Sequence, residues 1–421
     1  MSVPASDSDA SGRGTGALWL LRRHPAFRAL WGARVISFTG DSLSLVALML
    51  YVAEQTGQAL AVSVLLLVGD FAPALLGPLT GAISDRFDLK RVMLLCEVVQ
   101  GALLALIAFT LPPLPVLLVL VAARAIVGQV FQPASRAVVP ALVRGEDLEA
   151  ANASVGFGTQ AAEALGPLLA AAMFPLVGLR GVLLVDAASF LLSAVLLRAL
   201  PSVSPAREKD APPVSLFRQA RDGLLYLWRA RVARVVALGF CAVVAFNGVD
   251  DVALVLLAKD TFQAGDSAVG LLLGAVGLGL VAGYALMARL GAGAVMPVML
   301  VLGFAVSSVG NLLTGLAWAV SAALAMQAVR GVGIAAMDVA CHTLIQRWVP
   351  AGMRGRVFGN LYGAIGVAAG LSYVAGGLLL DATSAPVTLL VAGAGGTLAT
   401  LVVAWRLPGA LRAEAATRAP D

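Results

Sequence analysis

The sequence predicts an all-α integral membrane protein with twelve transmembrane helices in two pseudo-symmetric six-helix bundles. Of its 421 residues, 60% are hydrophobic and only 13% are charged, against about 25% in an average soluble domain. The mean hydropathy is +0.91. Apolar runs long enough to cross a bilayer alternate with short polar or Pro/Gly-containing interruptions, and the second half of the chain weakly repeats the first.

Cutting the chain at these interruptions gives the predicted spans and domains. The expected spans are 26–53, 58–83, 92–112, 115–139, 151–176, 179–199, 232–257, 267–289, 294–316, 318–342, 357–380 and 384–407. The expected domains are an N-terminal tail over 1–25, a first bundle over 26–200, a linker with an amphipathic helix over 201–231, a second bundle over 232–407 and a C-terminal tail over 408–421.

An internal repeat supports the division into two bundles. Arg124 and Arg330 coincide when the halves are aligned with an offset of 206, which is the difference between their numbers. The same offset places TGDSLSLVALMLYVAEQTGQ over AFNGVDDVALVLLAKDTFQA, and an offset two residues larger places PALVRGEDLEAANAS over WVPAGMRGRVFGNLY. Parallel repeats related by an axis along the membrane normal would produce this pattern.

The basic residues predict the orientation of the chain. They gather in the tails, in the central linker and in alternate connectors, whereas the opposite connectors offer little beyond Arg180 and Lys259. By the positive-inside rule, both termini and the linker are expected in the cytoplasm, in a multi-pass protein of a bacterial cytoplasmic membrane. The net charge of +5 is thus accounted for by topology, and the lipid bilayer rather than nucleic acid is the expected partner.

The sequence lacks the residues that several chemical functions require. The chain has no phosphate-binding G-x-x-x-x-G-K-[ST] loop and no G-x-S-x-G nucleophile motif. Its two histidines and three cysteines are scattered and form no metal-ligand spacing. We therefore expect no enzyme activity, no cofactor and no metal site.

The connector GAISDRFDLKR, between the second and third spans, carries charges of both signs. Such a cluster could hold helices together when one side of the protein is closed, or it could be a plain loop whose basic residues set the topology. We predict a cytoplasmic latch motif, to which nearby Glu97 and Arg136 would contribute structural bridges. Its members are Gly81, Asp85, Arg86, Asp88, Lys90, Arg91, Glu97 and Arg136.

Ionisable residues inside the spans are costly and predict polar sites. Asp41, Asp70 and Arg124 fall at similar depth, near the midplane, so they could meet. An acid pair beside an arginine could act as a proton switch, or it could be a permanently ionised structural bridge. Glu163 is a candidate site for a proton or a cationic substrate, unless it pairs with an arginine.

The same reasoning applies to the second half. Arg330 and Asp338 are eight residues apart, which places them within about 80° of each other around a helix, so they could share one polar face. The proton-coupling candidates are therefore Asp41, Asp70, Arg124, Glu163, Arg330 and Asp338. Asp186, Asp250 and Asp251 complete the acids within the spans.

These motifs resemble the major facilitator superfamily. GAISDRFDLKR is similar to its loop signature G-x-x-x-D-R/K-x-G-R/K-R/K, with Asp88 at the usual glycine and Leu89 at a usual basic position. Arg124-Ala-Ile-Val-Gly128 partly matches the proton-coupling motif R-x-x-Q-G but lacks its glutamine. Gly158, Gly166 and Pro167 resemble the antiporter helix-bend motif, in which the Gly-Pro pair could rock or be an ordinary kink.

The wider pattern looks like the drug-exporting branch, including macrolide and siderophore exporters. The resemblance implies export of a moderately hydrophobic small molecule by proton antiport and alternating access, as a monomer. A uniporter or symporter for a metabolite or lysolipid stays open, and a non-transporting sensor or scaffold is a more remote alternative. Candidates for the substrate cavity, which could instead be packing residues, are Trp31, Phe38, Phe246, Asn247 and Met337.

Overall fold

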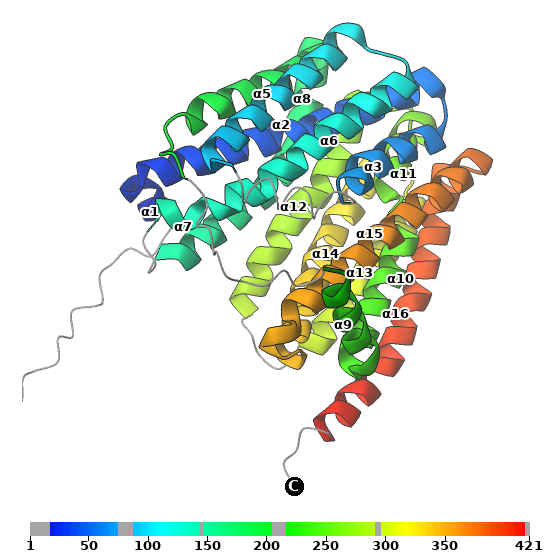
Figure 1. Ribbon diagram of the computed structural model, residues 1–421. Helices are drawn as coiled ribbons and strands as arrows, with labels where there is room; N and C mark the ends of the chain where they lie inside the picture. The colour runs from blue at the N-terminus through cyan, green and yellow to red at the C-terminus, as the bar shows by residue number, and fades with distance from the viewer. Residues whose placement is uncertain (1–16, 75–86, 144–146, 204–215, 291–295, 417–421) are drawn as a thin grey trace, which may run out of the picture.

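The computed structural model describes residues 17–74, 87–143, 147–203, 216–290 and 296–416. These residues are almost entirely helical and contain no strand. Figure 1 shows two groups of helices that meet at one end of the molecule and diverge toward the other. We call helices α1 to α8 the N-half and helices α9 to α16 the C-half.

The helices differ in length, and the longest is in the N-half. The N-half contains α1 (Ala17–Arg23), α2 (Pro25–Thr56), α3 (Ala59–Ala74), α5 (Leu89–Thr110), α6 (Leu114–Ala137), α7 (Val139–Leu142) and α8 (Leu148–Leu197). The C-half contains α9 (Leu216–Arg229), α10 (Arg231–Asn247), α11 (Asp250–Leu256), the π-helical turn η2 (Leu257–Thr261), α12 (Asp266–Leu290), α13 (Met296–Gly315), α14 (Val320–Trp348), α15 (Ala351–Ala382) and α16 (Ala385–Ala416).

Local sequence signals set several helix ends. Pro25 occupies the first turn of α2, where its missing N–H costs nothing, and α2 stops at Gly57, whose φ of 64° suits glycine. Asp88 caps α5 by accepting a hydrogen bond from the Arg91 backbone N–H at 2.9 Å. Asp88 therefore serves as the helix cap at the position where the similar loop signature usually has glycine.

The fifth and sixth predicted spans are joined without a polar loop. Helix α8 is 50 residues long, and its only non-helical residue is Gly178, with φ 62° and ψ −175°. This break falls between the predicted spans 151–176 and 179–199. A residue with a side chain would be strained at this φ, so glycine permits the chain to turn back here.

Within the part of the chain that the structure describes, ten helical regions are long and apolar enough to cross a membrane. One of the ten regions covers 44 residues of α8, Ser154–Leu197, and includes the break at Gly178. The structure describes the predicted second span as far as residue 74, and there Ala59–Gly69 forms a shorter apolar helix. The all-α membrane fold is thus confirmed, while the count of twelve spans and the domain boundaries stay predictions.

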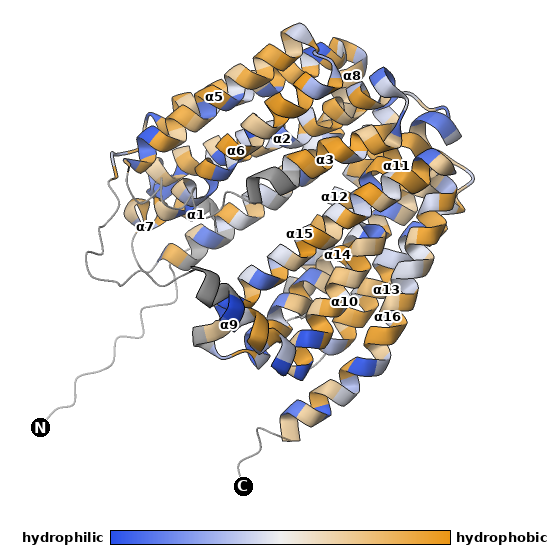
Figure 2. Ribbon diagram, turned by 45° about the vertical axis from the view of Figure 1, so that its right-hand side comes forward, coloured by the Kyte–Doolittle hydropathy of each residue, from blue (hydrophilic) through white to orange (hydrophobic). Residues whose placement is uncertain are grey.

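The outer surface of the described helices is apolar, as a lipid-facing surface must be. Figure 2 shows hydrophobic residues along the outward faces of both halves. Large apolar side chains that would be buried in a soluble protein are widely exposed, among them Leu176, Leu398 and Trp405. Because lipid is as apolar as these side chains, the hydrophobic effect does not drive the helices together within the bilayer. Close packing and polar contacts between helices must do so.

The buried apolar residues form three clusters, and their arrangement defines the two ends of the molecule. One cluster contains residues of both halves, such as Leu50 and Leu65 with Leu254 and Leu272. The other two belong to one half each, around Phe27 in the N-half and around Phe304 in the C-half. We call the end with the shared cluster the closed end and the opposite end the split end.

Close helix approach and polar contacts join the halves at the closed end. A Cβ on Gly277 of α12 would lie 2.5 Å from the Cα of Ala164 on α8, so only glycine permits this crossing. The Asp381 carboxylate of α15 accepts hydrogen bonds from the first two backbone N–H groups of α3, Ala59 at 2.6 Å and Leu60 at 3.1 Å. It thereby caps a helix of the other half.

Candidate functional site

A cavity of about 910 Å³ lies between the halves. It receives residues from α2, α6 and α8 on one side and from α12 and α14 on the other. Its lining is Arg34, Phe38, Gln132, Arg136, Asn152, Val155, Gly156, Phe157, Thr159, Glu163, Val281, Tyr284, Ala285 and Asp338. We call this space the central cavity. It combines aromatic and aliphatic surface with two carboxylates and two arginines.

A second cavity of about 490 Å³ lies within the N-half. Asp41, Arg124 and Glu163 line it together with Phe38 and three glutamines, Gln100, Gln129 and Gln132. Phe38, Gln132 and Glu163 belong to both linings, so the two cavities share a wall. We call this smaller space the N-half cavity.

Asp41 and Arg124 form an ion pair between α2 and α6. The structure therefore brings together two residues that sequence depth alone suggested could meet. The Asp41 side chain is 35% exposed, whereas that of Arg124 is 12% exposed. The carboxylate is part of the lining of the N-half cavity. Asp70 is part of α3, but its side chain lies outside the described residues.

Two further acids are buried close to this pair. Asp186 of α8 is fully buried, and Gly40 makes room for it, since a Cβ there would lie 2.1 Å from the Asp186 carboxylate. Ser189 donates a hydrogen bond to Asp186 at 3.0 Å. Glu97 of α5 is also fully buried. Neither of its oxygens meets a donor with regular geometry among the described residues, although the hydroxyls of Ser37 and Ser193 are near.

Glu163 has no ion-pair partner among the described residues, so the alternative that it pairs with an arginine is not supported there. Its side chain is exposed, and it lines the central cavity, the N-half cavity and a third space of about 160 Å³. Its position is set by backbone chemistry. Pro167 has no N–H to donate to the Glu163 carbonyl four residues earlier, and Ser42 of α2 donates to that carbonyl at 3.0 Å instead.

The helix-bend motif Gly158, Gly166 and Pro167 lies in a helical stretch of α8, and the non-helical residue is Gly178. Gly158 approaches Trp31, and Gly166 approaches Ser42 so closely that a Cβ would lie 2.4 Å from its Cβ. The motif therefore brings α8 close to α2. Whether it rocks during transport stays a prediction.

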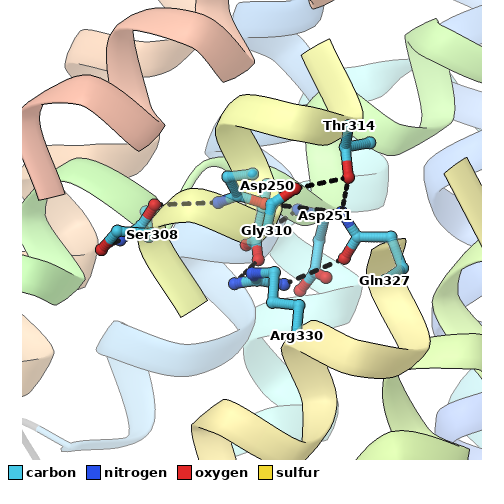
Figure 3. Close-up of polar contacts among 9 residues, drawn as sticks. Asp250, Asp251, Ser308, Gly310, Thr314, Gln327 and Arg330 are labelled. Carbon is cyan, nitrogen blue, oxygen red and sulfur yellow. Dashed lines mark hydrogen bonds and ion pairs between the residues drawn. The ribbon is translucent and has the colours of Figure 1, made fainter. Parts of the chain in front are cut away.

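In the C-half, Arg330 pairs with Asp250 of α11. Figure 3 shows this pair within a network of polar side chains. Arg330 donates to the Gln327 carbonyl at 3.2 Å, Gln327 donates to Thr314 at 3.0 Å, and Asn311 donates to Asn247 at 2.9 Å. The Arg330 and Asp250 side chains are only 6% and 10% exposed. We call these residues the C-half network.

Arg330 and Asp338 do not pair with each other, although both lie on α14. Asp338 faces the central cavity, where Tyr284 donates a hydrogen bond to it at 2.9 Å. His342 lies 3.4 Å from the other Asp338 oxygen and 2.5 Å from the Tyr362 hydroxyl. The spacing of the two residues on α14 stays compatible with a shared polar face, but each finds its partner on a different helix.

The described members of the latch motif make contacts within the N-half. Lys90 donates to the backbone carbonyls of Arg198 at 2.7 Å and Leu200 at 2.6 Å, where α8 has ended. Arg91 is exposed, and Arg136 lines the central cavity. Gly81, Asp85 and Arg86 lie outside the described residues. Glu97 is fully buried near Asp41 and Asp186, and its part in a latch stays a prediction.

Of the five predicted substrate-cavity residues, only Phe38 lines the central cavity. Trp31 packs between α2 and α8 and donates its indole N–H to the Ser154 carbonyl at 2.9 Å. Met337 is buried in the C-half core and Asn247 in the C-half network. Phe246 lies on the outer side of α10. These four residues lie outside the lining of the central cavity, and a role in binding substrate stays a prediction for all five.

Sequence reasoning missed two polar residues of the site. Arg34 is buried, donates to Ser135 and lies 5.1 Å from the centre of the Phe38 ring. Tyr284 lines the central cavity beside Asp338. The rarity of charged residues within spans signals Arg34, but a lone tyrosine gives no such signal. Among the described residues, no group of three or more His, Cys, Asp or Glu could hold a metal ion.

The fold and its cavities define a polytopic membrane protein of the transporter class. The sequence matches the family described as Major Facilitator Superfamily over residues 30–256 and 251–420. The chain therefore belongs to the major facilitator superfamily. The uncharacterized MFS-type transporter YfiS of Bacillus subtilis (strain 168) is 25% identical over 389 residues, which cover 89% of this chain and 91% of that protein.

Other relatives are more distant or shorter in overlap. Macrolide efflux protein A of Streptococcus pyogenes is 23% identical over 206 residues, 48% of this chain and 51% of that protein. The nucleoside transporter NupG (D323A mutant) has a similar fold, with a TM-score of 0.77, 11% identity and coverage of 90% and 99% of the two chains. A bacterial homologue of the iron transporter ferroportin, in an inward-facing state, gives a TM-score of 0.69, 18% identity and coverage of 91% and 98%.

Proposed function

We propose that this transporter exports a moderately hydrophobic small molecule, of drug, macrolide or siderophore type, in exchange for protons. The observation that carries the proposal is the Asp41–Arg124 ion pair on the wall of a cavity that adjoins the central cavity. A carboxylate in this position can meet protons from the cavity and can lose its arginine partner when it is protonated. Proton binding and helix packing are then coupled through one side chain.

The coupling follows from the energetics of buried ion pairs. When Asp41 is ionised, it holds α2 against α6 through Arg124. When it is protonated, Arg124 loses this partner, and the acids left nearby are Glu163 on the wall of the same cavity and the buried Asp186. An arginine that has lost its ion-pair partner is costly at this depth, so protonation favours a different arrangement of the helices.

The central cavity fits the proposed substrate class. Its volume of about 910 Å³ lies within the range of about 300–1,000 Å³ usual for small-molecule sites. Phe38, Phe157 and Val281 offer apolar surface, while Glu163 and Asp338 offer negative charge. This combination suits an amphiphilic molecule with a basic group. The partial similarity to macrolide efflux protein A supports the same class.

Alternating access would use the two ends of the molecule. With both termini in the cytoplasm, as the positive-inside rule predicts, the split end is cytoplasmic and the shared core seals the opposite side. Substrate would enter the central cavity from the cytoplasm. Rocking of the halves would then open the closed end and join the two clusters at the split end.

Flux in proteoliposomes tests this proposal. Purified protein is reconstituted, and uptake of lipophilic cations, macrolides and siderophores is measured with and without an imposed pH gradient. We expect accumulation of at least one compound to require the gradient and protons to move in the opposite direction. Flux that is unchanged when the gradient is collapsed would refute proton exchange and favour a uniporter. Protons that move together with the substrate would favour a symporter.

A further inference from the structure

We propose that the groove between α10 and α16 on the outer face of the C-half binds one anionic phospholipid. The groove has a volume of about 660 Å³, and Val235, Leu238, Ala242, Phe246, Leu398 and Val402 form its apolar part. None of its lining residues belongs to the central cavity. In Figure 1, α16 forms the outer edge of the C-half beside α10, where lipid would surround it.

Positive charge is confined to one end of the groove. Arg231 and Arg234 lie in the first turn of α10, and Arg406 lies on the facing part of α16. None of the three forms an ion pair with a carboxylate of the described residues. The Glu414 carboxylate at this end accepts a hydrogen bond from the Val232 backbone N–H at 2.7 Å. Arg234 also donates to the Trp228 backbone carbonyl at 2.9 Å. The remaining N–H groups of the three guanidiniums could therefore bind an anion.

Two observations place this end at the level of lipid headgroups. Helix α9 runs directly into α10, and its exposed face carries Leu224, Leu225 and Trp228, as expected for a helix lying in the membrane interface. Trp405, which is 76% exposed, lies beside Arg406 with the guanidinium 5.2 Å from its ring centre. Exposed tryptophan next to arginine is typical of the interfacial belt.

The dimensions of the groove fit a lipid of one leaflet. Residues 231 to 246 of α10 line it, which corresponds to about 22 Å of helix at about 1.5 Å per residue. Half of a bilayer with its headgroups is about 20–22 Å thick. Gly239 and Gly395 let α10 and α16 pack closely at the floor of the groove, since a Cβ there would lie 2.5 Å from Val403 and 2.3 Å from Phe246. Guanidiniums would contact the phosphate, and an acyl chain would follow the apolar part toward Phe246.

Titration of the purified protein with single lipids, followed by native mass spectrometry, tests the site. Phosphatidylglycerol and phosphatidylcholine with identical acyl chains are the probes. We expect wild-type protein to bind phosphatidylglycerol at least about tenfold more tightly. The variant R234Q/R406Q should reduce that preference about 25-fold, or until it disappears, at about fivefold for each charge lost near the surface. R234K/R406K should retain most of it.

Two further variants make the test specific. R180Q removes an exposed arginine from the other half and should leave the preference unchanged. A399F places a ring in the groove without altering any charge, so it should weaken binding of both lipids. Equal binding of the two lipids by wild-type protein would overturn the proposal. An effect of R180Q as large as that of R234Q/R406Q, or unchanged binding by A399F, would overturn it as well.

Discussion

The two halves each bury an arginine and an aspartate, yet they use the pair differently. Asp41 and Arg124 border a cavity, and the aspartate is about one third exposed. Asp250 and Arg330 are almost fully buried and are surrounded by amides and hydroxyls. The arginines occupy equivalent places in the repeat, 206 residues apart, but the aspartates do not. The arginine is thus found at the same position of both repeats. The position of its aspartate partner and the exposure of the pair differ between the halves.

The largest expected effect on stability comes from breaking the buried pair of Asp250 and Arg330. R330Q leaves Asp250 buried without a cation, and we expect a loss of about 3–5 kcal/mol in the free energy of unfolding. The midpoint of thermal unfolding in detergent measures this loss. R356Q is the matched control, because Arg356 and Asp222 form an exposed pair at 3.5 Å that contributes about 0–1 kcal/mol. Equal midpoints for R330Q and R356Q would show that the C-half network does not stabilise the fold.

A substitution in the Asp41–Arg124 pair should change transport more than stability. D41N keeps the shape of the side chain but cannot ionise, so gradient-driven accumulation should fall about 100-fold or more. Exchange of substrate across the membrane without a gradient should persist, because the cavity is intact. Accumulation and counterflow in proteoliposomes separate the two. Wild-type accumulation by D41N would remove this aspartate from the mechanism.

A third change tests whether the acids near Asp41 depend on close packing. G40A places a methyl group against Asp186 and Ser189, and overpacking of this kind costs about 1–3 kcal/mol. G359A serves as its control, since a Cβ at Gly359 meets no neighbour within 4 Å. Denaturation of both variants checks the difference. If G40A is as stable as G359A, Asp186 can move freely and is not held against α2.

The smallest expected effect concerns the carbonyl left free by Pro167. S42A removes the hydroxyl that bonds the Glu163 carbonyl and should cost about 1 kcal/mol. In a P167A background the backbone bond can re-form, so the same serine change should cost less. A double-mutant cycle of unfolding free energies gives the coupling. Strictly additive effects would mean that Ser42 does not compensate for the proline.

The sequence predicted the parts of the fold that the bilayer dictates. Span length and polarity predicted the boundary at Gly178. The similar depth of Asp41 and Arg124 within their spans predicted that they could meet. The partner of Arg330 was not predictable in this way, because helical spacing describes one helix and Asp250 lies on another. Lining residues such as Tyr284 were missed for a related reason. A helix surrounded by lipid and by other helices carries no amphipathic pattern that separates the two.

The cap that Asp381 places on α3 has a consequence for the speed of any opening at that end. Two amide groups of one half donate to a carboxylate of the other, at 2.6 and 3.1 Å. When the halves part there, these amides and the carboxylate must each gain a hydration shell at the same moment. The free-energy barrier to separating the halves would then depend on hydration of these groups as well as on helix motion. The rate of the transport cycle would depend on how readily water enters between α3 and α15.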